Sequence, residues 1–286
     1  MSPTLHTKLR AFPRRVRTRS IGKGLCLWTV LGMIGMLGCA EQNARNIAEK
    51  RPKHKLSTAW KPARIELFPG VRIDPDRQLV EFEAQVSMDC HDPQTPDVYL
   101  EVLCCVRNSR EYESLVVTDI KPSLIHAAML AVGLEPGAPG ILPNSVHPAR
   151  EPTGQRVEIR FVLVPESAKT NPAHPGSPIR ARIEDPTDWI VQKSTKKTLR
   201  QVYPQTAWVF AGSRIRLFQG QHVYDADWTG QLIGLHTFGS ETIAWTRLES
   251  PQASVTEPEW LADAAHVPAL GRPVIVQIYA VPKSQK

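Results

Sequence analysis

The sequence lacks the short motifs that mark the commonest enzymes. It contains no G-x-S-x-G elbow, no H-E-x-x-H, no P-loop, no dinucleotide-binding glycine fingerprint and no C-x-x-C pair. These absences exclude the enzyme families that depend on those motifs, but they do not exclude catalysis by another arrangement. The apolar run at residues 25–38 is also shorter than the roughly 20 residues that a membrane-spanning helix needs.

Acidic residues are missing from the first 38 positions, which hold seven Lys or Arg residues before the apolar run. Residues 36–39 are similar to a lipobox, where signal peptidase cuts before a lipid-modified cysteine. The pattern predicts a signal peptide over residues 1–38, a lipid such as palmitate on Cys39 and a polar tether over residues 39–62. An uncleaved anchor and a chance apolar run are the alternatives.

The predicted location is the bacterial cell envelope, with the protein lipid-anchored and facing the periplasm. Ala40 is not an aspartate that would retain a lipoprotein in the inner membrane, so we expect the outer membrane. Removal of the signal takes seven of the 35 basic residues and leaves 28, equal to the 28 acidic residues. A neutral mature chain gives no support for nucleic-acid binding. The expected partners are the membrane, through the lipid, and an unidentified envelope protein or ligand.

Cysteine is scarce in the mature chain, where only Cys90, Cys104 and Cys105 remain beyond the lipidated Cys39. Adjacent residues of a strand point to opposite faces, so at most one of Cys104 and Cys105 could easily reach Cys90. Three possibilities stay open at this stage. The thiols are buried and free, Cys90 forms a disulfide, or Cys90 and Cys105 serve a metal or redox site.

Alternating apolar and polar residues predict strands over 79–86, 157–163 and 274–280. A strand over 113–118 leads to Lys121-Pro122, where a helix can begin, and Gly133 ends that helix. A second, short helix is expected over 260–265. We therefore predict a single β-rich α+β domain over residues 63–282. Its sheets are mainly antiparallel, and one buried helix, residues 121–132, packs on the sheet.

Residues 110–137 resemble the signature of the YdjY-domain family of bacterial lipoproteins, in which K-E-H-E-S precedes a helix containing H-A and a G-x-x-P-G stop. Tyr112 departs from this pattern, because many members carry His there. Residues 208–213 resemble the family block W-V-F-x-G-S, and residues 224–233 resemble a third block. The resemblance spans roughly residues 61–282 and implies an envelope lipoprotein domain of uncharacterised function. The matching residues of the first block are Glu111, Glu113, Ser114, His126, Ala127, Leu130, Gly133 and Gly137.

The candidate functional cluster is Glu111, Glu113, Ser114 and His126, because the strand and the helix that follows it could bring carboxylate and imidazole together. In one interpretation Glu113 or a backbone carbonyl satisfies His126 in a structural network. In others the cluster binds a metal ion, or Ser114 is a nucleophile with His126 and Asp119.

The function that we expect from the sequence is that of a non-enzymatic binding or assembly module of the envelope. The alternative is a metal-binding or redox module centred on Glu113 and His126, with a metal ion as its cofactor. No residue is assigned a catalytic role.

Overall fold

The computed structural model describes residues 64–94, 97–163 and 181–282. The predicted signal peptide, Cys39 and the tether lie outside these residues. Within the described ranges, no helix is both long and apolar enough to cross a membrane.

Eight strands pair in a closed ring, in which the last strand of the order returns to the first. Most neighbours in the ring are antiparallel, and the pairs β14–β15 and β4–β5 are parallel. In the order of pairing, the ring consists of β3 (Leu79–Val86), β17 (Pro273–Ala280), β8 (Arg156–Leu163), β11 (Trp208–Val209), β15 (Ile243–Trp245), β14 (Gln231–Gly234), β4 (Val102–Val106) and β5 (Ser114–Thr118).

The predicted fold class was wrong in its arrangement, although the β-rich composition is right. A sheet with one helix packed on it was expected, and the structure has a closed barrel instead. The pairing of Gln85 with Val117 and of Val86 with Val116 joins β3 to β5 and closes the ring. Alternation within a strand indicates which face is buried, but it does not indicate which strand edges meet.

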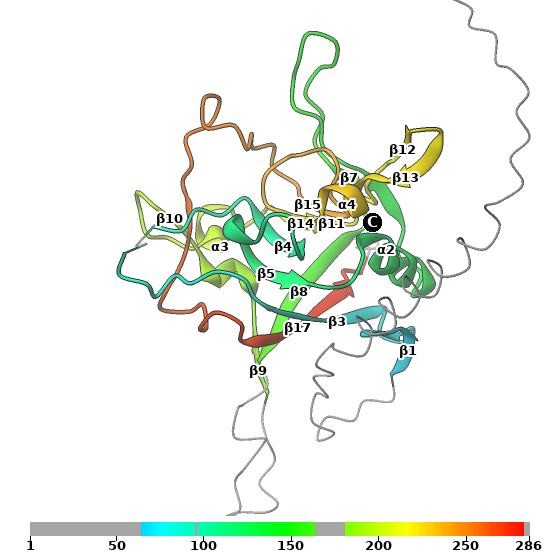
Figure 1. Ribbon diagram of the computed structural model, residues 1–286, viewed down its shortest axis with the longest axis horizontal. Coiled ribbons are helices and arrows are strands. Elements are labelled where there is room, and N and C mark those ends of the chain that lie inside the picture. Colours follow the sequence, from blue (N-terminus) through cyan, green and yellow to red (C-terminus); the bar gives the residue numbers. More distant parts are fainter. Residues whose placement is uncertain (1–63, 95–96, 164–180, 283–286) are drawn as a thin grey trace, which may run out of the picture. The chain divides into compact units, whose positions relative to one another are not determined.

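The remaining strands extend or flank the ring. Strand β2 pairs with the first half of the same β3 edge whose second half meets β5. Figure 1 shows the β12–β13 hairpin, in yellow, projecting beside α4. These strands are β1 (Ile65–Phe68), β2 (Val71–Asp74), β6 (Pro136–Ala138), β7 (Thr153–Gly154), β9 (Arg182–Glu184), β10 (Ile190–Gln192), β12 (Ile215–Phe218), β13 (Gln221–Tyr224) and β16 (Trp260–Ala262).

Strands β3, β8 and β17 follow the predicted alternation and bring large side chains into one core. On β8, Val157, Ile159 and Phe161 are buried, and the intervening Arg156 and Glu158 are exposed. Each of the three strands has eight residues, so their long antiparallel register aligns many apolar side chains. The packed interior holds Phe82, Phe161, Trp189, Phe210 and Trp260, all nearly inaccessible to water.

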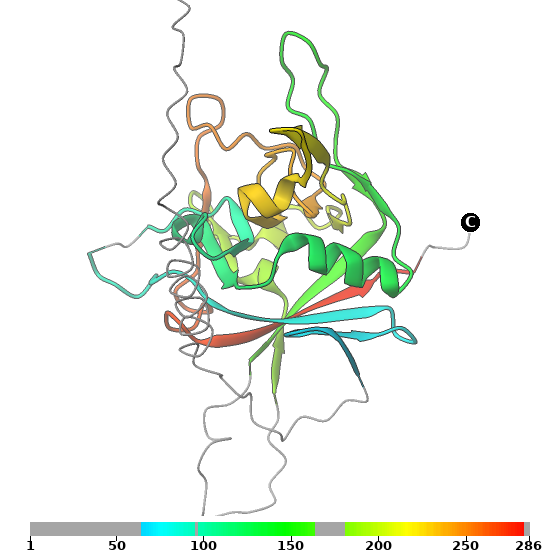
Figure 2. The same cartoon turned by 45° about the vertical axis from the view of Figure 1, so that its right-hand side comes forward.

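The described residues contain three α-helices, α2 (Pro122–Ala131), α3 (Leu199–Val202) and α4 (Asp225–Thr229). Helix α2 is the one expected over residues 121–132, and it contacts β2, β3 and α4. In Figure 2 it lies, in green, alongside the cyan strand β3. Ile125, Ala128 and Met129 are buried, whereas Leu130 is exposed, so one face of α2 rather than its whole surface is covered.

The short helix expected over 260–265 is not present. Trp260–Ala262 forms β16, which pairs with β10. Trp260 and Leu261 are both buried, because β10 lies beside them and other core residues pack around them. The tertiary partner therefore overrides the weak local helical pattern.

Candidate functional site

Glu111, Glu113 and Ser114 lie at a tight turn before β5. Glu111 and Glu113 belong to a 3₁₀ turn, η1 (Glu111–Glu113), and Ser114 opens the strand. The Glu111 carboxylate accepts the backbone N–H groups of Asn108 and Ser109. The buried Ser114 hydroxyl donates to the carbonyl of Arg110 over 2.8 Å. The side chains of Glu111 and Ser114 are thus engaged in holding the turn.

The contacts of His126 are with other residues than those of that turn. Its Nδ1 is 2.8 Å from the hydroxyl of Tyr224, and its ring meets Phe210 and Tyr224 edge-on. In the described part of the chain no hydrogen bond or ion pair connects His126 with Glu111, Glu113 or Ser114. Burial lowers the pKa of His126, so the ring is neutral near pH 7. The structure therefore does not assemble the predicted cluster around one point.

The Tyr224 hydroxyl joins His126 to two other segments. It donates to the carbonyl of Gly212 over 3.1 Å and lies 3.1 Å from Oγ1 of Thr242. Gly212 has a φ of +83°, and an added Cβ would lie 2.7 Å from Cβ of Pro136, so glycine is required there. His126, Gly212 and Tyr224 come from the three sequence blocks identified above, which meet at this hydroxyl.

A second contact ties the same blocks together. The carboxylate of Asp227, on α4, accepts the backbone N–H of Ser123 over 2.8 Å and its hydroxyl over 2.6 Å. Ser123 lies in the first turn of α2, whose own N-cap residue, Lys121, offers no side-chain acceptor. Asp227 therefore caps α2 from another helix. The sequence blocks specify a structural centre that fixes α2 against α4 and the strand ends.

Cys90, Cys104 and Cys105 are free and buried. Burial raises the pKa of all three thiols, so they are protonated near neutral pH. Among the described residues no group of three or more His, Cys, Asp or Glu side chains is arranged to hold a metal ion. The structure therefore offers no support for the metal or redox arrangement at Cys90, Cys105, Glu113 or His126.

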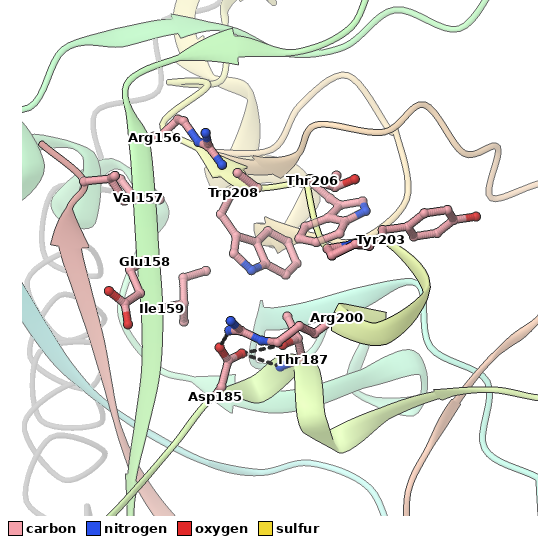
Figure 3. A pocket seen from close by; sticks show the side chains of 14 residues that line it. Arg156, Val157, Glu158, Ile159, Asp185, Thr187, Arg200, Tyr203, Thr206 and Trp208 are labelled. Atoms are coloured by element: carbon pink, nitrogen blue, oxygen red, sulfur yellow. Dashed lines mark hydrogen bonds and ion pairs between the residues drawn. The ribbon is translucent and has the colours of Figure 1, made fainter. Parts of the chain in front are cut away.

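One candidate site is a cleft of about 210 Å³ beside β8 and β11, which Figure 3 shows from close by. Trp208, on β11, pairs in register with Trp245, on β15, and their ring centroids are 4.8 Å apart. Both side chains belong to the barrel core, and both line the cleft. Small-molecule sites commonly lie at the mouths of barrels, on an apolar floor with a few polar groups.

Polar side chains form the walls of this Trp208–Trp245 cleft. On one side Asp185 accepts the backbone N–H and hydroxyl of Thr187, in the 3₁₀ turn η3 (Pro186–Trp189), and it pairs with Arg200 of α3. Figure 3 shows Arg156 on the opposite side, above Trp208. Arg156 is exposed and has no ion-pair partner among the described residues. The lining also includes Glu158, which pairs with Arg160, so Arg156 is the one charged side chain of the cleft without an ion-pair partner among the described residues.

The indole N–H of Trp245 distinguishes the cleft from the rest of the core. Trp189 donates its Nε1 hydrogen to Glu184 over 2.6 Å, and Trp260 donates to Glu249 over 2.9 Å. Trp245 is also buried, with 4% of its surface exposed, but its Nε1 has no hydrogen-bond partner among the described residues. A buried donor without an acceptor costs about 1–3 kcal/mol. The fold provides a carboxylate for the indoles of Trp189 and Trp260, and the described residues provide no acceptor for that of Trp245, which lies beside the cleft.

A family model of the YdjY domain matches residues 71–279, which is more than half of the chain. The chain belongs to the YdjY-domain family. This confirms the resemblance drawn from the sequence blocks, and the match includes every strand of the ring except the last residue of β17. No curated protein and no solved structure matches the chain.

Sequence reasoning did not single out the cleft within the YdjY domain. The seven tryptophans are spread along the sequence and form no cluster in it, and Trp208 and Trp245 are part of the core. Their pairing depends on the register of β11 with β15, which the sequence does not reveal. The nearest sequence signal was the block at residues 208–213, which begins with Trp208.

Proposed function

We propose that this YdjY-domain protein is a lipid-anchored protein of the bacterial cell envelope, which serves as a non-enzymatic binding or assembly module on the periplasmic side. Its ligand site is the Trp208–Trp245 cleft. The observation that carries this assignment is a cleft lined by two paired indole rings, one of which, Trp245, has a buried Nε1 without a hydrogen-bond partner among the described residues. The metal or redox alternative has no comparable observation in its favour.

The chemistry of the cleft indicates the class of ligand. Indole faces bind flat or ring-shaped groups, the Trp245 N–H requires an acceptor, and Arg156 provides an unneutralised positive charge. The volume of about 210 Å³ restricts the ligand to a small molecule or to one end of a larger one. A small anionic ring, such as a sugar acid or the acidic end of a larger glycan, fits these requirements.

Glucuronate is expected to bind more tightly than glucose, because only glucuronate offers a carboxylate to Arg156. Loss of one charge-assisted hydrogen bond in Arg156→Gln should weaken glucuronate binding about tenfold and reduce the preference over glucose. Trp245→Phe keeps an aromatic ring but removes the N–H donor, and it should also weaken binding. Isothermal titration calorimetry of the full-length protein measures each affinity.

Trp228→Phe is the matched control, because Trp228 is 61% exposed on α4 and does not line the cleft. It should bind glucuronate as the unaltered protein does. Equal affinity for glucose and glucuronate, or an Arg156→Gln variant with unchanged affinity, would contradict the assignment of an anionic ligand to this cleft.

Membrane attachment is expected to depend on Cys39. Cys39→Ser removes the thiol that would carry the lipid, so a bacterial host should no longer incorporate an alkyne-labelled palmitate analogue into the protein. The variant should also move from the membrane pellet to the soluble fraction after cell lysis and high-salt washing. Cys90→Ser is the control, because Cys90 is buried in the folded domain. Undiminished labelling of Cys39→Ser would rule out this site of lipidation.

A further inference from the structure

A second cavity, of about 310 Å³, differs from the Trp208–Trp245 cleft because carboxyl groups line it. Its wall includes Glu101 and Glu113, together with the imidazole of His236 and the rings of Tyr99 and Tyr112. Glu113 was part of the predicted cluster, whereas Glu101 and His236 were not singled out from the sequence. The cavity therefore places one predicted residue beside two that only the fold brings to it.

The two carboxyl groups of the cavity are held against each other. The backbone N–H of Glu101 donates to the carbonyl of Glu113 over 3.1 Å, and the two side chains share a hydrogen bond. Burial and the neighbouring Glu113 charge raise the pKa of Glu101 to about 7. Arg110 forms an ion pair with Glu113, and its Nη1 lies 3.5 Å from Oε2 of Glu101. One arginine therefore neutralises one carboxylate, and a proton is needed for the other.

His236 adds an unused acceptor to this cavity. His236 is only 7% exposed, and burial lowers the pKa of its ring to about 4, so the imidazole is neutral near pH 7. A neutral imidazole has one N–H donor and one nitrogen lone pair. Nδ1 has no hydrogen-bond partner among the described residues. The other contacts of the ring are with acceptors, the backbone carbonyl of Glu101 and the Glu249 carboxylate, which lies 3.8 Å from Nε2 and cannot donate when ionised. Whichever nitrogen carries the proton, the described residues supply no donor to the other.

The rim of the cavity already accommodates an ammonium group. Nζ of Lys193 lies 5.0 Å from the centre of the Tyr99 ring and 3.2 Å from the Asp97 carboxylate. Tyr112 stands beside the same opening and is 72% exposed, so its ring faces are accessible to a ligand. Aromatic faces attract cations. This residue occupies the position at which Tyr replaces the histidine of many family members.

We propose that the Glu101–Glu113 cavity binds a small primary ammonium ligand, whose three N–H groups donate to the two carboxyl groups and to the imidazole of His236. Glu101, Glu113 and His236 line the cavity with acceptor groups, and among the described residues Arg110 is the one cation that pairs with the two carboxyl groups. A primary ammonium provides three donors on one charged atom, which matches this deficit. The site is distinct from the Trp208–Trp245 cleft and does not depend on the function proposed for it.

Ligand binding replaces a bound proton with an ammonium ion. The ammonium enters with its own charge, and the proton shared by Glu101 and Glu113 leaves to solvent, so the net charge of the cavity is unchanged. Proton release is expected at pH values below the pKa of Glu101 and should vanish well above it. The charged or titratable groups near the carboxyl pair are Arg110 of the turn before β5, Asp97 with Lys193 at the rim, and His236, Glu249 and Arg247 of the loops packed against it.

Titration of the full-length protein with n-butylamine, with tetramethylammonium as the comparison, tests the proposal. Tetramethylammonium carries the same charge but no N–H donors. Calorimetry at pH 6 in two buffers of different ionisation enthalpy gives the number of protons released. Butylamine should bind with the release of close to one proton, and at least ten times more tightly than tetramethylammonium. Glu101→Gln should weaken butylamine binding at least tenfold and abolish the proton release.

Asp97→Asn is the matched variant, because it removes a rim carboxylate without touching the pair, and it should retain the proton release. A peptide with an acetylated N-terminus and one lysine, whose side-chain ammonium is its only amine, distinguishes the source of the ligand's ammonium group. Binding of the peptide as tightly as butylamine identifies a lysine side chain as an accepted ligand, and weaker binding restricts the site to small amines. Equal affinity for tetramethylammonium and butylamine, or no proton release at pH 6, would overturn the proposal.

Discussion

His126→Ala is expected to lower the free energy of unfolding by about 2–3 kcal/mol. The substitution removes a partly buried ring that packs edge-on against Phe210 and Tyr224, and it leaves the Tyr224 hydroxyl without one of its partners. Large-to-small replacements at packed positions cost about 2–5 kcal/mol, and the partial exposure of this ring places the expected loss near the lower end. Chemical denaturation at pH 7.5 measures the change.

Two comparisons separate packing from hydrogen bonding at this position. Tyr224→Phe keeps the ring contacts but removes the hydroxyl shared by His126, Gly212 and Thr242, and it should cost about 1–2 kcal/mol. The cost of His126→Ala should also shrink as the pH falls below 6.5. Burial lowers the folded-state pKa of His126, so the unfolded chain takes up a proton first and the unaltered protein loses this stability in acid. A cost that is constant with pH would contradict a buried, neutral imidazole.

Glu101→Gln is expected to stabilise the protein at pH 8 by about 2 kcal/mol and to change its stability little at pH 4.5. The folded-state pKa of Glu101 is raised to about 7, so the folded protein holds a proton that the unfolded chain releases near pH 4.5. Stability therefore falls as the pH rises between these values. Each pKa unit corresponds to about 1.4 kcal/mol, reduced here because the side chain is 20% exposed to water.

Glutamine resembles the protonated acid, since its NH₂ group can donate to the Glu113 carboxylate at every pH. The gain at pH 8 should raise the melting temperature by roughly 4–8 °C, which differential scanning calorimetry resolves. Glu158→Gln is the control, because Glu158 is exposed and paired only with Arg160 on β8. Its effect should be below about 1 kcal/mol at both pH values. An equal gain for Glu101→Gln at pH 4.5 and pH 8 would show that Glu101 does not hold the proton.

Local patterns predicted many individual elements of the domain. The strands at 79–86, 157–163 and 274–280 follow from period-two alternation, and the start of α2 follows from Pro122. The end of α2 follows from Gly133, whose φ is +83°. The family blocks also marked the positions that converge on the Tyr224 hydroxyl. These features depend on the sequence within a few residues, where backbone sterics and hydrophobic periodicity act.

Local sequence patterns did not predict which residues the candidate site residues would contact in the fold. His126 was expected to meet Glu113 or a backbone carbonyl. Its Nδ1 bonds to the Tyr224 hydroxyl and the ring also has a backbone hydrogen bond with Gly212, and both partners are distant in sequence. The cavity residue Glu101 precedes β4, and its partner Glu113 precedes β5. They lie together because β4 and β5 are parallel neighbours, with Val102 in register with Ser114. A parallel pairing of this kind leaves no turn signal in the sequence.

The sequence by itself determined the membership of the YdjY-domain family, the β-rich composition and the individual strands, and it predicted the lipid anchor. The tertiary structure alone decided that the sheet closes through β3 and β5, that Trp208 faces Trp245 in a cleft, and that Glu101 meets Glu113. The physical reason is that side-chain alternation specifies a buried face within each strand. The choice of neighbouring strand is made by the packing of the whole core, to which residues from every part of the domain contribute.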